Sequence, residues 1–275
     1  MADTESVRNH KPIMLLPAHA GRAVLDLLGY FGAMAIFFAL AFVNIFRRRQ
    51  LLEIANQVYT IGARSSLIVL LVGLFTGMVL GLQLFYTLVK FGAVGALGSA
   101  VALSLIRELG PVLAAIIITA RAGSAMAAEI GILRISEQID ALYTMRIDPV
   151  RYLISPRVAA SIISFPLLAA FFDLIGIFGG YVSGVLLLGT NAGTYFYRVQ
   201  SSVDFVDVRG GFIKALVFAV IVSTICCFQG YFCHMRTQGF GAKAVGLATI
   251  SAVVLSCVLI LIADYVVTSF LMEGW

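Results

Sequence analysis

The sequence predicts an all-α integral membrane protein with five transmembrane helices. Of its 275 residues, 61% are hydrophobic and only 12% are charged, whereas a soluble domain carries about 25% charged residues. So few charges cannot cover a surface that faces water, and lipid must therefore be the solvent for much of the chain. Five long apolar stretches and an uneven distribution of arginine and lysine support the same fold class.

The apolar stretches have the length that a membrane requires, which is about 20 residues for a helix. Five of them qualify as spans, at about 67–89, 97–120, 158–188, 212–232 and 248–271. A sixth stretch, 27–46, ends at three consecutive arginines. Its length allows it to cross the membrane, and its glycine and aromatic content also suits a helix that lies in the interface. Both interpretations stay open on the residues alone.

Basic residues predict the orientation, because cytoplasmic loops carry an excess of lysine and arginine. With a cytoplasmic N-terminus and five crossings, 14 of the 19 basic residues fall on the cytoplasmic side. Four fall outside, namely Lys90, Arg198, Arg209 and Lys214, and Arg107 lies within a span. The segment 190–211 is then the one sizeable outside loop. Residues 1–22 are polar and lack the apolar core of a cleavable signal peptide, so we expect a polar extension followed by one domain, 23–275.

The composition argues against several kinds of catalytic site. The four cysteines, Cys226, Cys227, Cys233 and Cys257, lie in or beside apolar segments without C-x-x-C spacing, which predicts packing residues and no metal ligands. No Gly-Lys dipeptide occurs anywhere in the chain, so a phosphate-cradling Walker A loop is impossible. We therefore expect no catalytic residue, no metal, no cofactor and no nucleic-acid partner.

Two sets of glycines recur at intervals of four residues, which places each set on one face of a helix. The sets are Gly73, Gly77 and Gly81, and Gly176, Gly180 and Gly184. Such stripes let helix backbones approach closely in a membrane. We interpret them as packing surfaces, with a cavity wall or a sliding interface as the alternative.

Charged residues within the apolar stretches are costly, by about 2.5–3.5 kcal/mol each on insertion scales, and usually face a partner or a cavity. Arg107 and Glu108 interrupt the second span and are followed by Pro111. Because proline has no N–H, it leaves the Arg107 carbonyl free and favours a kink. A lipid-headgroup or gating role and a structural ion pair to another helix both fit this pattern. For Asp173 and Asp264, single acids in apolar spans, we favour a buried hydrogen bond or interface position over substrate contact.

The predicted cytoplasmic loop 121–157 contains a short amphipathic helix. Ser136 is placed to cap it, Glu137 and Asp140 lie in its first turn, and Arg146 lies near its end. Ile139, Leu142 and Tyr143 share one face, and Pro149 after Asp148 prevents continuation. A helix resting on the lipid surface and a docking helix for a soluble partner are both consistent with these residues.

Several sequence runs resemble the MlaE family, the ABC permeases of lipid-asymmetry and MCE-type systems. The runs are Gly77-Met-Val-Leu-Gly-Leu-Gln83, Ala102-Leu-Ser-Leu-Ile-Arg-Glu-Leu-Gly-Pro111 and Ala120-Arg-Ala-Gly-Ser-Ala-Met-Ala-Ala-Glu-Ile-Gly131, followed by Ser136-Glu-Gln138 through Asp148-Pro149 to Ser155-Pro-Arg157. They cover about residues 60–165. The remainder agrees in hydropathy and length more than in motif.

The resemblance implies a fold and a set of site residues. It implies five spans preceded by an N-terminal membrane-embedded interfacial helix at about 23–50, and a cytoplasmic coupling helix between spans two and three. It implies a glycerophospholipid substrate near Leu80, Leu84, Arg107 and Glu108. It also implies that a separate ATPase docks on Ser136, Glu137, Gln138, Asp140, Leu142, Arg146 and Asp148.

The resemblance further implies partners and a location. The expected assembly is a homodimer in the bacterial inner membrane with its N-terminus in the cytoplasm. It would bind ABC ATPase subunits on the cytoplasmic face, a hexameric MCE-domain protein in the periplasm and, in some systems, a STAS-domain protein. The expected function is phospholipid transport between the inner membrane and the MCE partner, which maintains outer-membrane lipid asymmetry.

Other functions remain as alternatives on the residues. The first is an ABC permease for a sterol or another lipid. The second is an ion-coupled carrier that uses Glu108, Asp173 and Asp264 as a relay. The third is an intramembrane protease with Ser124 and His234 as a dyad, although the run around Ser124 is a small-residue packing run.

Overall fold

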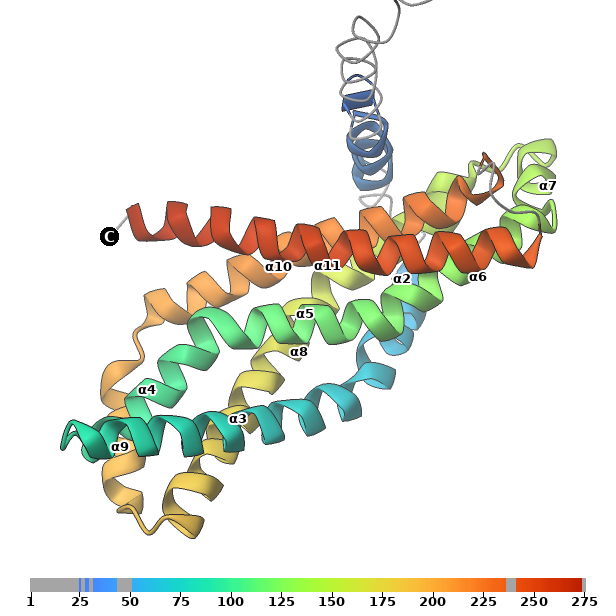
Figure 1. Cartoon of the computed structure of the whole chain (residues 1–275). Helices are drawn as coiled ribbons and strands as arrows, with labels where there is room; N and C mark the ends of the chain where they lie inside the picture. The colour runs from blue at the N-terminus through green and yellow to red at the C-terminus, as the bar shows by residue number, and fades with distance from the viewer. Residues whose placement is uncertain (1–24, 26–27, 30–31, 44–50, 236–240, 274–275) are drawn as a thin grey trace, which may run out of the picture.

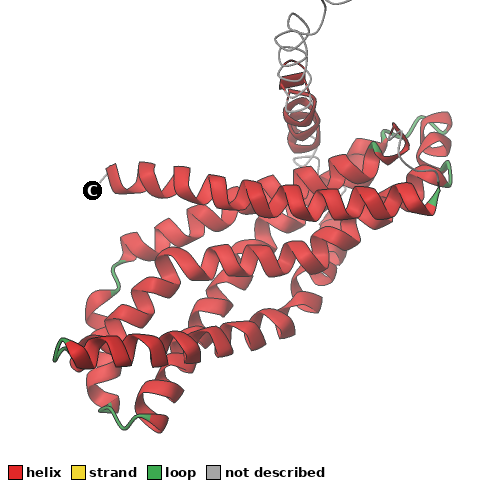
Figure 2. Ribbon diagram, in the orientation of Figure 1, coloured by secondary structure: helices red, strands yellow, loops and turns green. Residues whose placement is uncertain are grey.

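The computed structural model describes residues 25, 28–29, 32–43, 51–235 and 241–273. Every regular element among these residues is a helix (Figure 2). Five helical stretches are long and apolar enough to cross a membrane, namely Leu51–Lys90, Val94–Ile135, Val150–Leu187, Phe205–Tyr231 and Ala242–Leu271. The predicted all-helical membrane fold with five spans is therefore confirmed.

Three of the spans are chains of α-helix and π-helical turns. The first joins α2 (Leu51–Val58), the π turn η2 (Tyr59–Ala63) and α3 (Arg64–Lys90). The second joins η3 (Val94–Ala96), α4 (Leu97–Ser104), the π turn η4 (Leu105–Leu109), α5 (Gly110–Ile118), the π turn η5 (Thr119–Gly123) and α6 (Ser124–Ile135). The third joins the π turns η6 (Val150–Ile154) and η7 (Val182–Leu187) to the two ends of α8 (Ser155–Tyr181). These helices extend past the predicted apolar stretches, because hydropathy marks the part in lipid whereas backbone hydrogen bonds continue the helix beyond it.

The last two spans are the single helices α10 (Phe205–Tyr231) and α11 (Ala242–Glu273). Three short helices lie between the spans: α7 (Gln138–Thr144), α9 (Ala192–Ser202) and the 3-10 turn η8 (Cys233–Met235). The spans form one bundle, with α7 at one end and α9 at the other (Figure 1). We call these the α7 end and the α9 end. Under the predicted topology, the α7 end is cytoplasmic.

The N-terminal predictions are only partly within the described residues. The extension 1–22 lies outside them, as do parts of the predicted interfacial helix 23–50. The described part is an apolar helix, Gly32–Val43, which is shorter than a span. Its buried Phe37 ring lies 5.6 Å from the Phe228 ring, and Ser155 Oγ donates to the Ala41 carbonyl at 2.8 Å. This helix is thus anchored to α8 and α10.

The segment 190–211, expected as a loop, contains α9 and the first turns of α10. Asn191 caps α9 by accepting a hydrogen bond from the Thr194 amide at 3.0 Å. The Asp207 carboxylate accepts from the Asp204 amide at 3.1 Å, at the start of α10. The buried Tyr195 side chain attaches α9 to α8, because its hydroxyl donates to the Ile177 carbonyl at 2.9 Å. The connection between the third and fourth spans is therefore largely helical, because capping residues start two helices there.

The stripe Gly73, Gly77 and Gly81 is where α3 packs against α8, whereas Gly180 and Gly184 of the second stripe face Val101 and Leu97 of α4. A Cβ atom built on Gly77 would collide with the Gly176 carbonyl, and one on Gly179 would collide with the Leu74 carbonyl. Only glycine allows backbones this close, which is how helices associate in lipid without a hydrophobic driving force. The predicted packing role of the stripes is confirmed.

We predict that Gly77→Ala destabilises the bundle by about 1–3 kcal/mol, because the added methyl group overpacks the α3–α8 contact. The measurement is the unfolding midpoint of the purified protein in detergent. Gly246→Ala is the matched control, since nothing lies within 4 Å of a Cβ built there. The control should keep or raise the midpoint, and equal midpoints for both variants would contradict the packing role.

Candidate functional site

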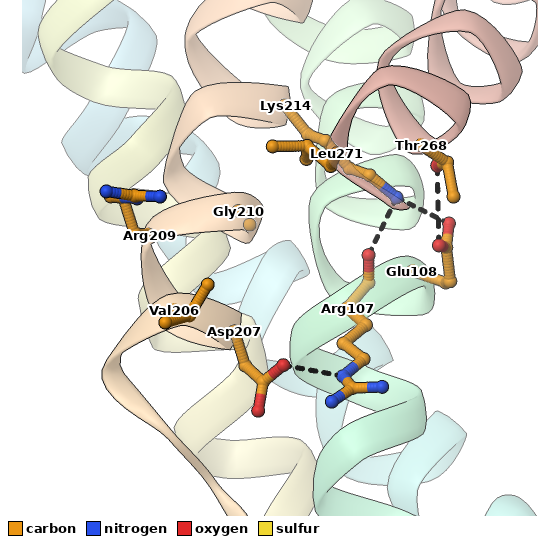
Figure 3. Close-up of a pocket in the computed structure, with 10 residues that line it drawn as sticks. Arg107, Glu108, Val206, Asp207, Arg209, Gly210, Lys214, Thr268 and Leu271 are labelled. Carbon is orange, nitrogen blue, oxygen red and sulfur yellow. Dashed lines mark hydrogen bonds and ion pairs between the residues drawn. The ribbon is translucent and has the colours of Figure 1, made fainter. Parts of the chain in front are cut away.

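A cavity of about 270 Å³ lies where the second span, α10 and α11 meet. Charged residues on two of these helices line it, with Arg107 and Glu108 from the second span and Asp207 and Lys214 from α10 (Figure 3). The rest of the lining consists of two apolar side chains, Val206 and Leu271, together with Arg209, Gly210, Gly211 and Thr268. Both charged and apolar side chains thus line the cavity.

The backbone of the second span sets the position of the charges. Arg107 and Glu108 lie on the π turn η4, and Pro111 follows in α5. Because Pro111 has no N–H to return to the Arg107 carbonyl, that oxygen needs a donor from elsewhere. Lys214 Nζ donates to it at 2.8 Å. A side chain from α10 therefore completes the hydrogen bonding of a helix that proline interrupts.

Arg107 pairs with α10 rather than with its sequence neighbour. Its Nε donates to the Asp207 carboxylate at 2.6 Å. The Asp207 side chain is buried, whereas 45% of the Arg107 side chain is exposed at the cavity.

Lys214 is the centre of a second group of contacts. Its Nζ lies 2.6 Å from Glu108 Oε2 and 3.1 Å from Asp264 Oδ1. The Asp264 contact is an ion pair by distance without the angle of a hydrogen bond. Thr268 adds a long bond of 3.4 Å to Glu108 Oε1. Only 3% of the Lys214 side chain is exposed, against 44% for Glu108.

This arrangement suits a ligand with a charged head and an apolar body. A buried cation is stable only when it is paired, and Lys214 has two carboxylates and a carbonyl around it. Arg107 and Glu108 offer one positive and one negative side chain at the cavity surface. Phosphodiester and amine groups are the charges that these side chains recognise.

The structure does not bring the four predicted substrate residues into one cavity. Arg107 and Glu108 lie together, but Leu80 lines a separate cavity of about 430 Å³ along α3. Leu109 lines that cavity as well, from the neighbouring turn of the second span. Leu84 is partly buried and packs on the core of the bundle.

Sequence reasoning missed Asp207, Lys214 and Thr268. The count of basic residues places Lys214 outside, and Asp207 falls within the predicted loop 190–211, whereas both side chains are buried in α10. One signal was available for Lys214, which lies two residues inside the apolar stretch 212–232. A lysine at that depth requires a partner.

The two single acids behave differently. Asp264 joins the Lys214 cluster, whereas Asp173 lines another cavity, of about 200 Å³, between α8 and α10. The Asp173 carboxylate lies against Gly110, where a Cβ atom would collide with it. The three acids of the ion-relay alternative therefore do not form one chain, since Glu108 and Asp264 share Lys214 and Asp173 lines a different cavity.

The side chains of the protease alternative have other partners. Ser124 Oγ donates to the Ala120 carbonyl of its own helix at 2.5 Å. His234 Nδ1 accepts from Arg134 Nε at 3.0 Å. The geometry gives no support to a Ser–His dyad.

A short helix, α7, is present at the other end of the bundle, with one correction. Ser136 does not cap it, because α6 continues to Ile135 and Ser136 Oγ donates back to the Ile132 carbonyl at 2.8 Å. Glu137, with a left-handed φ of 59°, precedes α7 instead. Arg146 lies beyond the end of α7 and is also left-handed, with a φ of 60°.

Three side chains tie α7 to its neighbours. Ile139 of α7 is itself buried. The Tyr143 and Tyr231 hydroxyls lie 2.7 Å apart, which links α7 to the end of α10. Arg134 of α6 donates to the Asp140 carboxylate at 2.8 Å. Arg134 also approaches His234, and burial together with the Arg134 charge lowers the pKa of that imidazole.

The predicted docking residues lie on α7 and on the turns that flank it, and most of them are exposed. Those exposed are Ser136, Glu137, Gln138, Asp140, Arg146 and Asp148, while Leu142 is partly buried. Asp148 Oδ1 accepts from the Val150 amide at 3.0 Å and so begins the next helical segment.

The model of the family described as Permease MlaE matches residues 54–270. The chain belongs to the MlaE permease family. The match runs from α2 to the last turns of α11 and thus includes the cavity and α7. The chain is a multi-pass membrane protein and a permease of the ABC transporter type.

Relatives at high coverage agree with the MlaE assignment. A probable ABC transporter permease protein of Rickettsia typhi is 42% identical over 243 residues, which are 88% of this chain and 92% of the relative. The intermembrane phospholipid transport system permease protein MlaE of Haemophilus influenzae is 43% identical over 219 residues, 79% of this chain and 82% of that protein. The chloroplastic TRIGALACTOSYLDIACYLGLYCEROL 1 protein of Arabidopsis thaliana is 36% identical over 80% of this chain and 61% of its own.

We predict that Lys214→Met destabilises this MlaE-family permease by about 3–5 kcal/mol. The substitution removes the cation that pairs with Glu108 and Asp264 and the hydrogen bond from Lys214 to the Arg107 carbonyl, which leaves uncompensated charge in the bundle. The measurement is again the unfolding midpoint in detergent, with the exposed Lys90→Met as control. The triple variant Lys214→Met, Glu108→Gln, Asp264→Asn should recover part of the loss, because it removes the uncompensated charges. A Lys214→Met midpoint equal to the control would contradict the assignment.

Proposed function

We propose that the chain is the membrane-spanning subunit of an ABC transporter that moves glycerophospholipid between the inner membrane and a periplasmic MCE partner. In a bacterial cell, this activity would maintain the lipid asymmetry of the outer membrane. The chain holds the lipid and does not hydrolyse ATP, which a separate subunit does. The sequence is consistent with this division, since it contains no Gly-Lys dipeptide.

The cavity between the second span, α10 and α11 is the observation that carries the proposal. Arg107 would bind the phosphate, because a guanidinium offers several donors in a fork that matches phosphate oxygens. Glu108 would accept from an ethanolamine amine where the headgroup has one. Val206 and Leu271 line the same cavity and would contact the glycerol and the upper acyl chains.

A homodimer would extend the apolar part of the site. The cavity along α3, beside Leu80 and Leu109, is lined almost entirely by apolar side chains. A second copy against this face would enclose it, and the acyl chains would then meet Leu80. Leu84 lies one turn further along α3 and would support the same wall.

The outward face of α7 is the proposed docking surface for the ATPase. Two left-handed residues, Glu137 and Arg146, bracket α7, and Ile139 anchors it. A short helix held at both ends moves as a unit when a partner pushes it. Glu137, Gln138 and Asp140 would meet the ATPase directly. A STAS-domain protein would bind the ATPase in those systems that contain one.

The proposed orientation follows from the basic residues. The N-terminus and the α7 end face the cytoplasm, and the α9 end faces the periplasm and the hexameric MCE protein. The permease protein MlaE of Haemophilus influenzae carries a name that refers to intermembrane phospholipid transport, which supports phospholipid as the substrate.

Another hydrophobic substrate, such as a sterol, is the main alternative within the same transporter class. The charges in the cavity favour phospholipid. A sterol presents a single hydroxyl and no charge, so the exposed parts of Arg107 and Glu108, which are already paired with Asp207 and Lys214, would gain no charge-assisted bond from it. A phospholipid supplies a phosphate for one and, in phosphatidylethanolamine, an amine for the other.

The first test is photocrosslinking from position 271. A photoreactive residue in place of Leu271, in the full assembly in vesicles, should capture acyl-labelled phosphatidylethanolamine. Arg107→Gln should lower the yield about tenfold, because a charge-assisted phosphate contact is lost. A photoreactive residue at Leu174, an exposed position on α8, is the control and should give a background yield that Arg107→Gln leaves unchanged. Equal dependence at both positions, or none at either, would refute the cavity assignment.

The second test concerns α7. Glu137→Lys should abolish most ATP-driven lipid movement while the protein remains inserted, because a reversed charge on the docking face repels the ATPase. Glu53→Lys, an exposed acid on α2, is the control and should keep wild-type coupling. The measurements are the ATPase rate of the complex with lipid and the ATPase subunit recovered on purification. Wild-type coupling in Glu137→Lys would remove α7 from the interface.

A further inference from the structure

A second polar cavity lies nearer the α7 end than the site described above. It has a volume of about 100 Å³ and lies between the α2–α3 junction and the η5–α6 junction. Two arginines line it, Arg64 at the start of α3 and Arg121 in η5. Gln57 and Thr60 add polar atoms from the first span. The volume exceeds that of one water molecule about threefold, which is enough for a small polar group.

The charges of these two arginines have no carboxylate partner among the described residues. Arg64 lies over the Tyr59 ring, with its Cζ 5.8 Å from the ring centroid. Arg121 Nη1 donates to Ser65 Oγ, a neutral acceptor, at 3.3 Å. Their guanidinium groups have five donors each, so most of their hydrogen-bonding capacity remains for a ligand.

A carboxylate in the same cavity does not cancel this charge. Glu129 lines the cavity as well, but its Oε2 is paired with Arg157 Nη2 at 3.0 Å. The Arg157 charge therefore offsets that of Glu129. The cavity retains a net positive charge from Arg64 and Arg121 and attracts an anion.

Both spans contain a π-helical turn at the level of this cavity. The π turn Tyr59–Ala63 directly precedes Arg64, and the π turn Thr119–Gly123 contains Arg121. Single π turns inside α-helices are rare and occur often at functional sites. Arg107 and Glu108 of the second span also lie on a π turn, so the two cavities share this local geometry.

The position of the cavity along the spans corresponds to the edge of the hydrocarbon core. Arg64 stands just before the apolar stretch 67–89, and Arg121 directly follows the stretch 97–120. Arg121 lies roughly 21 Å along the helix from Arg107, at 1.5 Å per residue. A membrane whose apolar core is about 30 Å thick therefore places Arg64 and Arg121 at the phosphate level of the leaflet at the α7 end. Basic pockets between spans at that level are known to bind lipid headgroups.

We infer that Arg64 and Arg121 form a binding site for the phosphate of a phospholipid headgroup in the leaflet at the α7 end. This site is separate from the Arg107 cavity and binds lipid whether or not the protein transports it. Arg121, oriented by Ser65, and Arg64, oriented by Tyr59, would hold the phosphate from two sides. Gln57 would contact the headgroup beyond it.

The test is photocrosslinking from position 125, because Ala125 is exposed and lines this cavity. Full-length protein in vesicles of phosphatidylethanolamine and phosphatidylglycerol should capture acyl-labelled phosphatidylethanolamine. It should not capture acyl-labelled diacylglycerol, which has no phosphate. The double variant Arg64→Gln, Arg121→Gln should lower capture about tenfold, as expected for lost charge-assisted bonds.

Two controls separate this site from bulk lipid and from the transport cavity. Lys243→Gln, an exposed basic residue of α11 at the same end, should leave capture unchanged. Capture from position 271 should be unaffected by the double variant. If capture from position 271 fails while capture from position 125 depends on Arg64 and Arg121, the proposed transport cavity is wrong and the phosphate site at the α7 end still holds.

Other outcomes overturn the inference. Capture from position 125 that is the same in the double variant, or the same for diacylglycerol, shows contact with bulk lipid only. Binding of inorganic phosphate to the purified protein, with no arginine-dependent capture of lipid in vesicles, identifies a free anion as the ligand. Arg64→Gln alone keeps the test valid if the double variant is unstable, because Arg64 is exposed; it should lower capture by a smaller factor, and no change would also refute the inference.

Discussion

The structure depends on one constraint: a polar group in the middle of a membrane must find its partner inside the protein. Pro111 has no N–H to donate to the Arg107 carbonyl, and Lys214 Nζ donates to that oxygen at 2.8 Å. The same Lys214 ammonium is paired with Glu108 and Asp264, so one side chain joins the second span, α10 and α11. The three helices meet beside this cavity because the buried Lys214 ammonium needs carboxylate partners.

The π turns explain how the charged side chains reach their partners. A π turn carries one more residue per hydrogen-bonded ring than an α-helix, so it rotates the residues that follow it around the helix axis. In the second span, the charged residues of both cavities lie on such turns, with Arg107 in η4 and Arg121 in η5. Between them, α5 is apolar and largely buried. The two π turns thus carry charged side chains at two levels of the span, and the apolar helix α5 separates these levels.

The sequence predicted the fold well and the site only in part, and the difference follows from the range of the interactions. Five spans follow from hydropathy, and the close contact of α3 with α8 follows from glycine spacing, because both are local patterns. The partners of Arg107 and Glu108 are about 100 residues away in α10, and no local pattern encodes that pairing. Ser136 was misassigned because the end of α6 and the start of α7 compete for the same residue.

The arrangement of α10 suggests how the two ends of the bundle communicate. Its last residue, Tyr231, contacts Tyr143 of α7, and Lys214 holds the cavity roughly 25 Å away along the same helix. α10 is also the most buried of the five spans, with 67% of its apolar window inside the protein, so it has little freedom to bend between these points. If a partner moves α7, as proposed, a stiff α10 would displace Lys214 and Asp207 relative to Arg107 and Glu108. Because ion pairs at 2.6 Å weaken steeply when stretched in an apolar environment, a small displacement would change how strongly the cavity holds a headgroup.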